Sequence, residues 1–226
     1  MIEFKHVRLR YHYDDSVVLK DLNFTLSNGV NTILCDSQSG KSSVCKLLTK
    51  QFAPIDGQIC VDGQDISGIT NRDLGILYIP SEPAFFENRS VAYNITYPLK
   101  VRKAAKDERI KRFDEIASKF NLTYGDVKLK KLSKSERKRV ALARGLTVKR
   151  KTVLFDDFFE SADQIDEVIS LFDDVETIVI LTSNINLVRG NVVVLDDGVA
   201  VYQGDVNGAR EIRKNLSWIV DILRSE

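Results

Sequence analysis

Residues 35 to 43, which read CDSQSGKSS, contain the triplet Gly40, Lys41 and Ser42 that ends a phosphate-binding loop. In such loops backbone N–H groups point at phosphate oxygens, the lysine reaches the outer phosphates, and the following hydroxyl binds magnesium. An apolar stretch at 32–35 precedes the loop, and apolar residues at helical spacing follow it as far as Phe52. The order of strand, loop and helix therefore predicts a nucleotide phosphate site.

A second group of residues could hold the magnesium ion of a nucleotide. Residues 153 to 157 read VLFDD, three apolar residues followed by two acids. At the end of a buried strand Asp156 would bind the metal, and Asp157 would orient or activate the attacking water. The plainer interpretation, that the acids only end a strand, is weakened by the phosphate loop.

Ser133 and Glu136 have the spacing of a capping box, in which a serine caps a helix start and the glutamate reaches back to it. That structural role alone would explain both residues. Lys and Arg are concentrated at 128–151, but no aromatic residue for base stacking accompanies them. We interpret the stretch as a solvated helix face and expect no nucleic acid partner.

The remaining elements follow from the apolar pattern. Strands are expected at 2–11, with an irregularity near His6, and at 22–26, 32–35, 59–61, 76–79, 152–155, 177–181, 192–195 and 199–202. Between about 91 and 151 the apolar spacing is helical, and a closing amphipathic helix is expected at 212–223. The pattern predicts an α/β core interrupted by a helical lobe.

The composition is that of an ordinary globular protein of 226 residues, 43% hydrophobic and 29% charged, with a net charge of +1. No apolar run approaches the roughly 20 residues of a membrane span, and the first residues lack the apolar stretch of a secretion signal. Three cysteines without C-x-x-C spacing suggest neither a disulfide framework nor a zinc site. We therefore expect a cytoplasmic protein.

Taken together, these segments resemble the ATP-binding cassette family, the nucleotide-binding subunits of ABC transporters. The resemblance extends from Ile2 to about Asp205. CDSQSGKSS takes the place of the Walker A motif, YIPSEPAFFENRSVAYNITYPL the segment that contacts the membrane subunit, LSKSERKRVALARGL the signature helix, VLFDD the Walker B motif, and ESAD the loop that crosses the dimer. Tyr11, or nearby Tyr13, stands where an aromatic residue stacks on adenine.

The resemblance implies an α/β fold, a P-loop NTPase of the ABC ATPase type, with a mixed central sheet, an antiparallel β subdomain and a helical lobe. Residues 1–226 would form one nucleotide-binding domain, with a core at 1–80 and 152–226 and the lobe at about 81–151. The implied cofactors are ATP and Mg²⁺. The implied ATP-binding residues are Tyr11, Ser37, Gln38, Ser39, Gly40, Lys41, Ser42, Ser43, Ser133 and Ser135, and the implied metal ligands are Ser42 and Asp156.

The resemblance also implies partners. In the family two cassettes enclose two ATP molecules, each between the Walker A motif of one chain and the signature of the other. The chain would pair with a second ABC subunit, as a homodimer or a heterodimer, and with a membrane permease subunit. It would then be cytoplasmic and peripheral at the inner face of the membrane.

Two glycines of the family's phosphate loop are replaced, by Cys35 and by Gln38. Gln38 occupies a position that the general loop pattern leaves free. Cys35 breaks that pattern, and if its backbone required a positive φ we would expect strain of about 1 to 3 kcal/mol. Such strain would weaken nucleotide binding without abolishing it.

Three positions implied to be catalytic are also altered. Ser81 replaces a glutamine that senses magnesium and water, Asp157 replaces a glutamate, and Ser183 follows the strand where a histidine supports the γ-phosphate. Misplacing a carboxylate by about 1 Å can cost on the order of 100-fold in rate. Lys134, Ser135 and Glu136 depart from the signature as well and predict a weaker phosphate contact. We therefore expect slow ATP hydrolysis, or none.

Two alternatives come from other classes. The altered positions would equally suit a non-enzymatic regulatory or scaffold protein that uses nucleotide-dependent dimerisation. A P-loop kinase acting on a small molecule would explain neither the signature-like helix nor Tyr11.

Overall fold

The computed structural model describes residues 1–11, 16–36 and 39–223. The chain forms two compact units, the first made of Met1–Tyr78 and Lys151–Glu226 and the second of Ile79–Arg150. Each unit is described by itself. The assignment of both to one nucleotide-binding domain stays a prediction.

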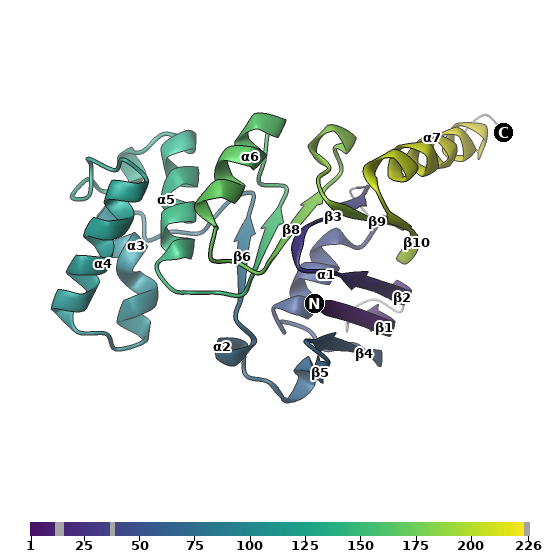
Figure 1. Ribbon diagram of the computed structural model, residues 1–226, viewed down its shortest axis with the longest axis horizontal. Coiled ribbons are helices and arrows are strands. Elements are labelled where there is room, and N and C mark those ends of the chain that lie inside the picture. Colours follow the sequence, from purple (N-terminus) through teal and green to yellow (C-terminus); the bar gives the residue numbers. More distant parts are fainter. Residues whose placement is uncertain (12–15, 37–38, 224–226) are drawn as a thin grey trace. The chain divides into compact units, whose positions relative to one another are not determined.

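A mixed sheet dominates the first unit (Figure 1). Its strands are β1 (Ile2–Arg10), β2 (Val17–Leu26), β3 (Gly29–Cys35), β4 (Asp56–Val61), β5 (Gln64–Asp65), β6 (Ile76–Pro80, whose last two residues belong to the second unit), β7 (Thr152–Asp156), β8 (Thr177–Thr182), β9 (Asn191–Asp196) and β10 (Val199–Gly204). They lie in the order β5-β4-β1-β2-β10-β9-β3-β8-β7-β6. The predicted mixed sheet is confirmed.

Parallel and antiparallel pairing occupy different parts of this sheet and meet at β10, which pairs parallel with β2 and antiparallel with β9. Strands β7, β8, β3 and β9 are parallel neighbours, whereas β2, β1, β4 and β5 pair antiparallel. The parallel strands are almost continuously buried, as expected for strands covered on both faces. The antiparallel strands alternate buried and exposed residues, which made them visible in the sequence as period-two patterns.

The irregularity expected near His6 is confirmed. The register between β1 and β2 shifts between Phe4 and Val7, and His6 has a φ of 53°. Gly57 on β4 lies against this bulge, where an added Cβ would be only 2.2 Å from the His6 carbonyl oxygen. The bulge restores the inward orientation of Val7 after the shift in phase.

Helix α1 (Lys41–Leu48) packs on one face of the sheet. Its apolar residues Val44, Leu47 and Leu48 join one core cluster with buried residues from β1, β2, β3, β8 and β9. The helix ends at Leu48, with Thr49 as its C-cap, so Phe52 lies beyond the helix that its spacing had predicted. Phe52 instead packs its ring against Tyr11, at 4.9 Å between centroids.

The other helices of the first unit are α2 (Asn71–Leu74), α6 (Ala162–Leu171) and α7 (Val206–Leu223). Helix α7, the predicted closing helix, packs Ile212 and Leu216 against a second cluster built by Leu34, Val188, Val192, Val194 and Ala209. Side chains alternate between the two faces of a strand, so Leu34 of β3 joins this cluster while Cys35 joins the cluster around α1.

The second unit is helical, with α3 (Val91–Val101), α4 (Lys106–Lys119) and α5 (Lys134–Leu146). Both α4 and α5 pack against α3 (Figure 1). The capping box at the start of α5 is confirmed, because Ser133 N–H donates to Glu136 Oε2 at 2.8 Å and Glu136 N–H donates to Ser133 Oγ at 3.4 Å. Within 1–11, 16–36 and 39–223, no helix has the length and apolar character needed to cross a membrane.

Candidate functional site

The loop after β3 leads directly into α1. Cys35 is the last residue of β3, pairs with Leu195 of β9 and is fully buried. Its backbone is extended and has no positive φ, so the strain considered for this substitution does not arise. Burial raises the pKa of the Cys35 thiol to about 12, although the ammonium of Lys41 acts in the opposite direction. The thiol is therefore neutral at physiological pH and adds no charge at the loop.

Gly40 is the N-cap of α1 and requires glycine for two reasons. Its φ of 96° lies in the left-handed region, which disfavours side chains. A Cβ would also lie 2.5 Å from Leu19 Cδ2. Gly40 thus lets the chain turn tightly into the helix, and the N–H groups of the first turn are left without partners inside the helix.

Lys41, the first residue of α1, points to the end of β7. Its ammonium donates a hydrogen bond to Asp157 Oδ2, with the lysine side chain 10% exposed and the aspartate 46% exposed. Asp157 follows the last residue of β7 with a φ of 45°, and its N–H donates to the Leu181 carbonyl at 3.0 Å. The lysine of the loop and the acid after β7 are thus brought together across 116 residues of sequence.

Asp156, the last residue of β7, is buried. Its Oδ2 accepts a hydrogen bond from the Tyr78 hydroxyl at 2.9 Å. Burial raises the pKa of the Asp156 carboxyl group, and the bond from Tyr78 and the charge of Lys41 partly offset this. Burial and the nearby Asp156 charge also raise the pKa of Tyr78, so its hydroxyl stays a hydrogen-bond donor.

Tyr11 lies beside the same helix. Its hydroxyl is 2.8 Å from Ser43 Oγ, and the Lys46 ammonium sits 4.9 Å from the centre of its ring. The ring also contacts the edge of Phe52. These contacts hold Tyr11 beside Ser43 and Lys46 of α1. The role of Tyr11 toward adenine stays a prediction.

Three further predicted residues of the first unit, Ser39, Ser42 and Ser183, follow the carboxyl ends of β3 and β8. Ser39 is buried, and its N–H donates to the Asp36 carbonyl at 3.1 Å. Ser42 is exposed in the first turn of α1. Ser183 is exposed and follows Thr182, which pairs with Leu34 of β3. Ser37, Gln38 and Tyr13 lie outside the described residues.

Three predicted residues belong to the second unit. Ser81 is exposed, just after the end of β6. Ser133 and Ser135 lie at the start of α5, where their hydroxyl oxygens are 3.2 Å apart. The bonds that Ser133 donates to the Glu136 carboxylate lower the pKa of that group, so Glu136 is ionised at neutral pH. The roles of these three serines toward nucleotide stay predictions.

Tyr78 is a site residue that sequence reasoning missed. Its position in β6 was predicted, but only the order of strands brings it to Asp156. An alternating pattern shows which residues share a face and not which strand lies next to which. A tyrosine in a strand is ordinarily a packing residue, so no local signal marked its hydroxyl.

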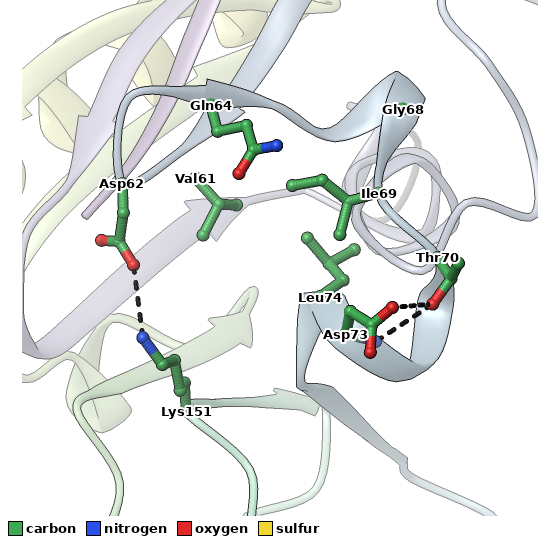
Figure 2. A pocket seen from close by; sticks show the side chains of 9 residues that line it. All are labelled: Val61, Asp62, Gln64, Gly68, Ile69, Thr70, Asp73, Leu74 and Lys151. Atoms are coloured by element: carbon green, nitrogen blue, oxygen red, sulfur yellow. Dashed lines mark hydrogen bonds and ion pairs between the residues drawn. The ribbon is translucent and has the colours of Figure 1, made fainter.

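A separate hollow of about 530 Å³ lies beside β4, β5 and α2 (Figure 2). It is lined by Val61, Asp62, Gln64, Gly68, Ile69, Thr70, Asp73, Leu74 and Lys151. Its acids are already paired, because Lys151 Nζ lies 3.7 Å from Asp62 and the Thr70 hydroxyl donates to Asp73 at 2.7 Å. None of the predicted site residues lines it, so it contributes nothing to the candidate site.

The residues around Lys41 fit a magnesium nucleotide. A phosphate group would find a buried ammonium and the free N–H groups of a helix start. Magnesium takes one or two protein oxygens and leaves its other positions to phosphate and water, so Ser42 and Asp156 suffice. The described part of the chain contains no cluster of three or more His, Cys, Asp or Glu that could hold a metal ion.

Comparison with known proteins agrees with this geometry. The family model described as ABC transporter matches residues 19–160. The Fe(3+) ions import ATP-binding protein FbpC of Pasteurella multocida (strain Pm70) is 34% identical over 155 residues, 67% of this chain and 44% of that protein. The alpha-hemolysin translocation ATP-binding protein HlyB of Escherichia coli O157:H7 is 30% identical over 222 residues, 90% of this chain and 31% of that protein. The chain thus spans less than half the length of these curated relatives.

Two solved structures share the fold. CbiO1 from Clostridium perfringens, part of the ABC transporter complex cbiONQ, has a TM-score of 0.79 and 22% identity, covering 99% of this chain and 98% of that one. A bacterial Atm1-family ABC exporter with ATP bound has a TM-score of 0.78 and 24% identity, covering 92% of this chain and 39% of that one. At these identities the likeness concerns the fold alone, and it confirms the predicted ABC ATPase fold.

Proposed function

This chain belongs to the ABC transporter family, and on that premise we propose that it is the ATP-binding subunit of a membrane transporter. It binds Mg-ATP at the loop between β3 and α1. Lys41 reaches the outer phosphates, and the N–H groups of Ser42 and Ser43 face them. Tyr11 stacks on the adenine.

The contact between Lys41 and Asp157, the acid after β7, is the observation that supports this proposal most. It joins the phosphate loop to the place where a magnesium ligand is needed. The ammonium is mostly buried and therefore interacts more strongly with charge than an exposed lysine does. A lysine at a plain helix start would normally extend into water.

Magnesium would be held by Ser42 and Asp156, and it would supply positive charge that neutralises the phosphate oxygens. Burial of Asp156 leaves its carboxylate poorly solvated, which favours a bound cation. The Tyr78 hydroxyl satisfies one oxygen and leaves the other for the metal. Tyr78 thereby orients the carboxylate of Asp156 toward the metal.

Hydrolysis is proposed to be slow. Asp157 is one methylene shorter than glutamate, and its carboxylate turns toward Lys41. Ser81 and Ser183 carry hydroxyl groups where longer polar side chains would reach a γ-phosphate and its attacking water. A water molecule is therefore held by fewer and shorter groups, which lowers the rate.

The proposed partners are a membrane permease subunit and a second ABC subunit, identical or different. The proposed location is cytoplasmic, at the inner face of the membrane. In a dimer, Ser133 and Ser135 at the start of α5 would contact the nucleotide held by the other subunit. The N-cap geometry of Ser133 supports this, because it orders the helix start.

Calorimetric titration of the chain with Mg-ATP tests the binding proposal. The wild-type chain is expected to bind, and K41A is expected to lose at least about tenfold in affinity because it removes a charged phosphate contact. K149A, an exposed lysine of the second unit, serves as a matched control and should bind as the wild type does. Equal affinity of K41A and wild type would refute the proposal.

The alternative function is regulatory or scaffolding, through nucleotide-dependent dimerisation without turnover. The carboxylate of Asp157 on Lys41 favours it, since the same contact draws the acid away from attacking water. Light scattering with Mg-ATP distinguishes the two. A dimer that forms and persists supports the scaffold, and a dimer that forms and decays as phosphate appears supports the slow ATPase.

A further inference from the structure

Arg213 on α7 forms two hydrogen bonds with Asp36, the first residue after β3. Its Nη1 donates to Oδ2 at 2.8 Å, and its Nη2 donates to Oδ1. Paired bonds of this kind fix the orientation of both groups and are stronger than neutral ones. The arginine side chain is only 25% exposed, compared with 56% for the aspartate. The pair is therefore partly shielded from water.

Asp36 is tied to the phosphate loop on its other side as well. Its carbonyl accepts the Ser39 N–H at 3.1 Å, immediately before Gly40 and α1. Its carboxylate is thus a negative charge within the loop that is proposed to receive a polyanion. Such a charge repels phosphate unless a cation offsets it.

The packing of α7 determines where Arg213 lies. Ile212, the residue directly before Arg213, packs together with Leu216 against Leu34 of β3 and its neighbours. The start of the helix is tied down too, because Gly208 N–H donates to Asp205 Oδ1 at 2.8 Å. The helix is therefore anchored on the strand that leads into the loop, and it presents Arg213 at the end of that strand.

We propose that Arg213 is a positioning residue of the nucleotide site, which acts through Asp36 by neutralising its negative charge at the entrance of the phosphate loop. The inference rests on the proposed function and extends the site to Arg213 of α7, which is 177 residues from Asp36 in sequence. The affinity of the loop for a triphosphate would then depend partly on α7, which acts through Asp36.

A double-mutant cycle with Mg-ATP binding tests this. R213A is expected to weaken binding about three- to tenfold, the range for losing a partly exposed charge-assisted pair. R213K should lose less, because it keeps the charge. D36N should bind at least as tightly as the wild type, and adding R213A to D36N should change affinity by less than about twofold, because no carboxylate is left to neutralise.

Salt dependence separates this electrostatic role from a structural one. The difference between R213A and wild type should shrink when NaCl is raised from about 0.05 M to about 0.5 M, because salt screens the exposed carboxylate. R189A is the matched control, since the Arg189 side chain is 30% exposed and forms an ion pair at 3.3 Å with Asp166, which is not a residue of the loop. It should bind Mg-ATP as the wild type does.

Three outcomes would overturn the inference. R213A could bind as tightly as the wild type, it could lose the same factor in the D36N background, or R189A could lose as much. Each leaves the proposed function intact as long as K41A still weakens binding by at least about tenfold. Failure of the wild type to bind Mg-ATP would instead refute the proposed function, and the role of Arg213 with it.

Discussion

The ammonium of Lys41 donates a hydrogen bond to the carboxylate of Asp157, so the phosphate-loop lysine has an anionic partner within the chain. An incoming phosphate must compete with that carboxylate. Asp157 itself has a left-handed backbone conformation, directly after the end of β7. Affinity for nucleotide and the placement of the candidate catalytic acid are therefore coupled through one ion pair.

Replacing Asp157 by asparagine is expected to tighten Mg-ATP binding. D157N keeps the shape of the side chain but removes its negative charge, and a partly exposed ion pair of this kind contributes up to about 1 kcal/mol, or about fivefold. Calorimetry measures the affinity. D174N removes the same charge from an exposed position elsewhere in the unit and should leave binding unchanged. Weaker binding of Mg-ATP by D157N would contradict the expectation that the Asp157 carboxylate competes with phosphate for Lys41.

The paired change D157E and S183H is expected to raise ATP turnover. It restores the longer acid and introduces an imidazole at the carboxyl end of β8, beside β3 and β7. If misplacement of these groups limits the rate, the gain should be at least about tenfold. Phosphate release assays measure it, and adding K41A should abolish it. No gain in a variant that still binds Mg-ATP would show that other groups limit turnover.

Gly40→Ala is expected to destabilise the chain by about 1 to 3 kcal/mol, because it combines a positive φ with a Cβ 2.5 Å from Leu19. Urea unfolding without nucleotide measures the free energy of unfolding. G68A is the control, since Gly68 has no positive φ and nothing lies within 4 Å of an added Cβ. Equal losses in both variants would refute a specific role for the backbone of Gly40.

The buried carboxyl group of Asp156 should make stability depend on pH. Burial raises its pKa in the folded chain, so folding favours the protonated form. The contribution of this raised pKa to the free energy of unfolding is fully present below the pKa of an unfolded aspartate, about 4. It is lost as pH rises through the raised pKa of the folded chain. D156N cannot ionise and should gain stability relative to wild type over that window.

Parallel unfolding curves of D156N and wild type across this pH range check the expectation. The difference between the two isolates Asp156 from other titrating groups, including Glu136, whose pKa is lowered. The asparagine can still accept the Tyr78 hydroxyl bond. A difference that stays constant with pH, or that favours wild type as pH rises, would show that burial does not destabilise the ionised carboxyl group.

Much of the fold was predictable because its signals are local. The alternation of β1 and β2, the helical spacing after Lys41 and the spacing of Ser133 and Glu136 each depend on a few consecutive residues. Even the bulge at His6 leaves a local trace, since it shifts the phase of the apolar pattern. The end of α1 was harder to predict from the sequence, because Phe52 continues the helical spacing of apolar residues although the helix ends at Leu48.

The strain considered at Cys35 shows where sequence reasoning lacked information. A glycine in a motif shows that glycine is tolerated there, and it does not show which backbone angle the loop adopts. In the structure Cys35 is still part of β3, paired with Leu195, and the left-handed residue is Gly40. Backbone angles depend on how the strand is paired, which the loop sequence does not contain.

The residue pattern alone was enough to propose which residues bind phosphate and metal, to predict the order of strand, loop and helix around them, and to indicate the ABC transporter family. The contacts of Lys41 with Asp157, of Tyr78 with Asp156 and of Arg213 with Asp36 became visible only in the folded chain. Each pair joins residues that are far apart in the chain and lie on, or directly after, strands and helices that become neighbours only through the packing of the fold. Local patterns encode periodicity and chemistry, whereas such pairings depend on which elements pack together to bury their apolar faces.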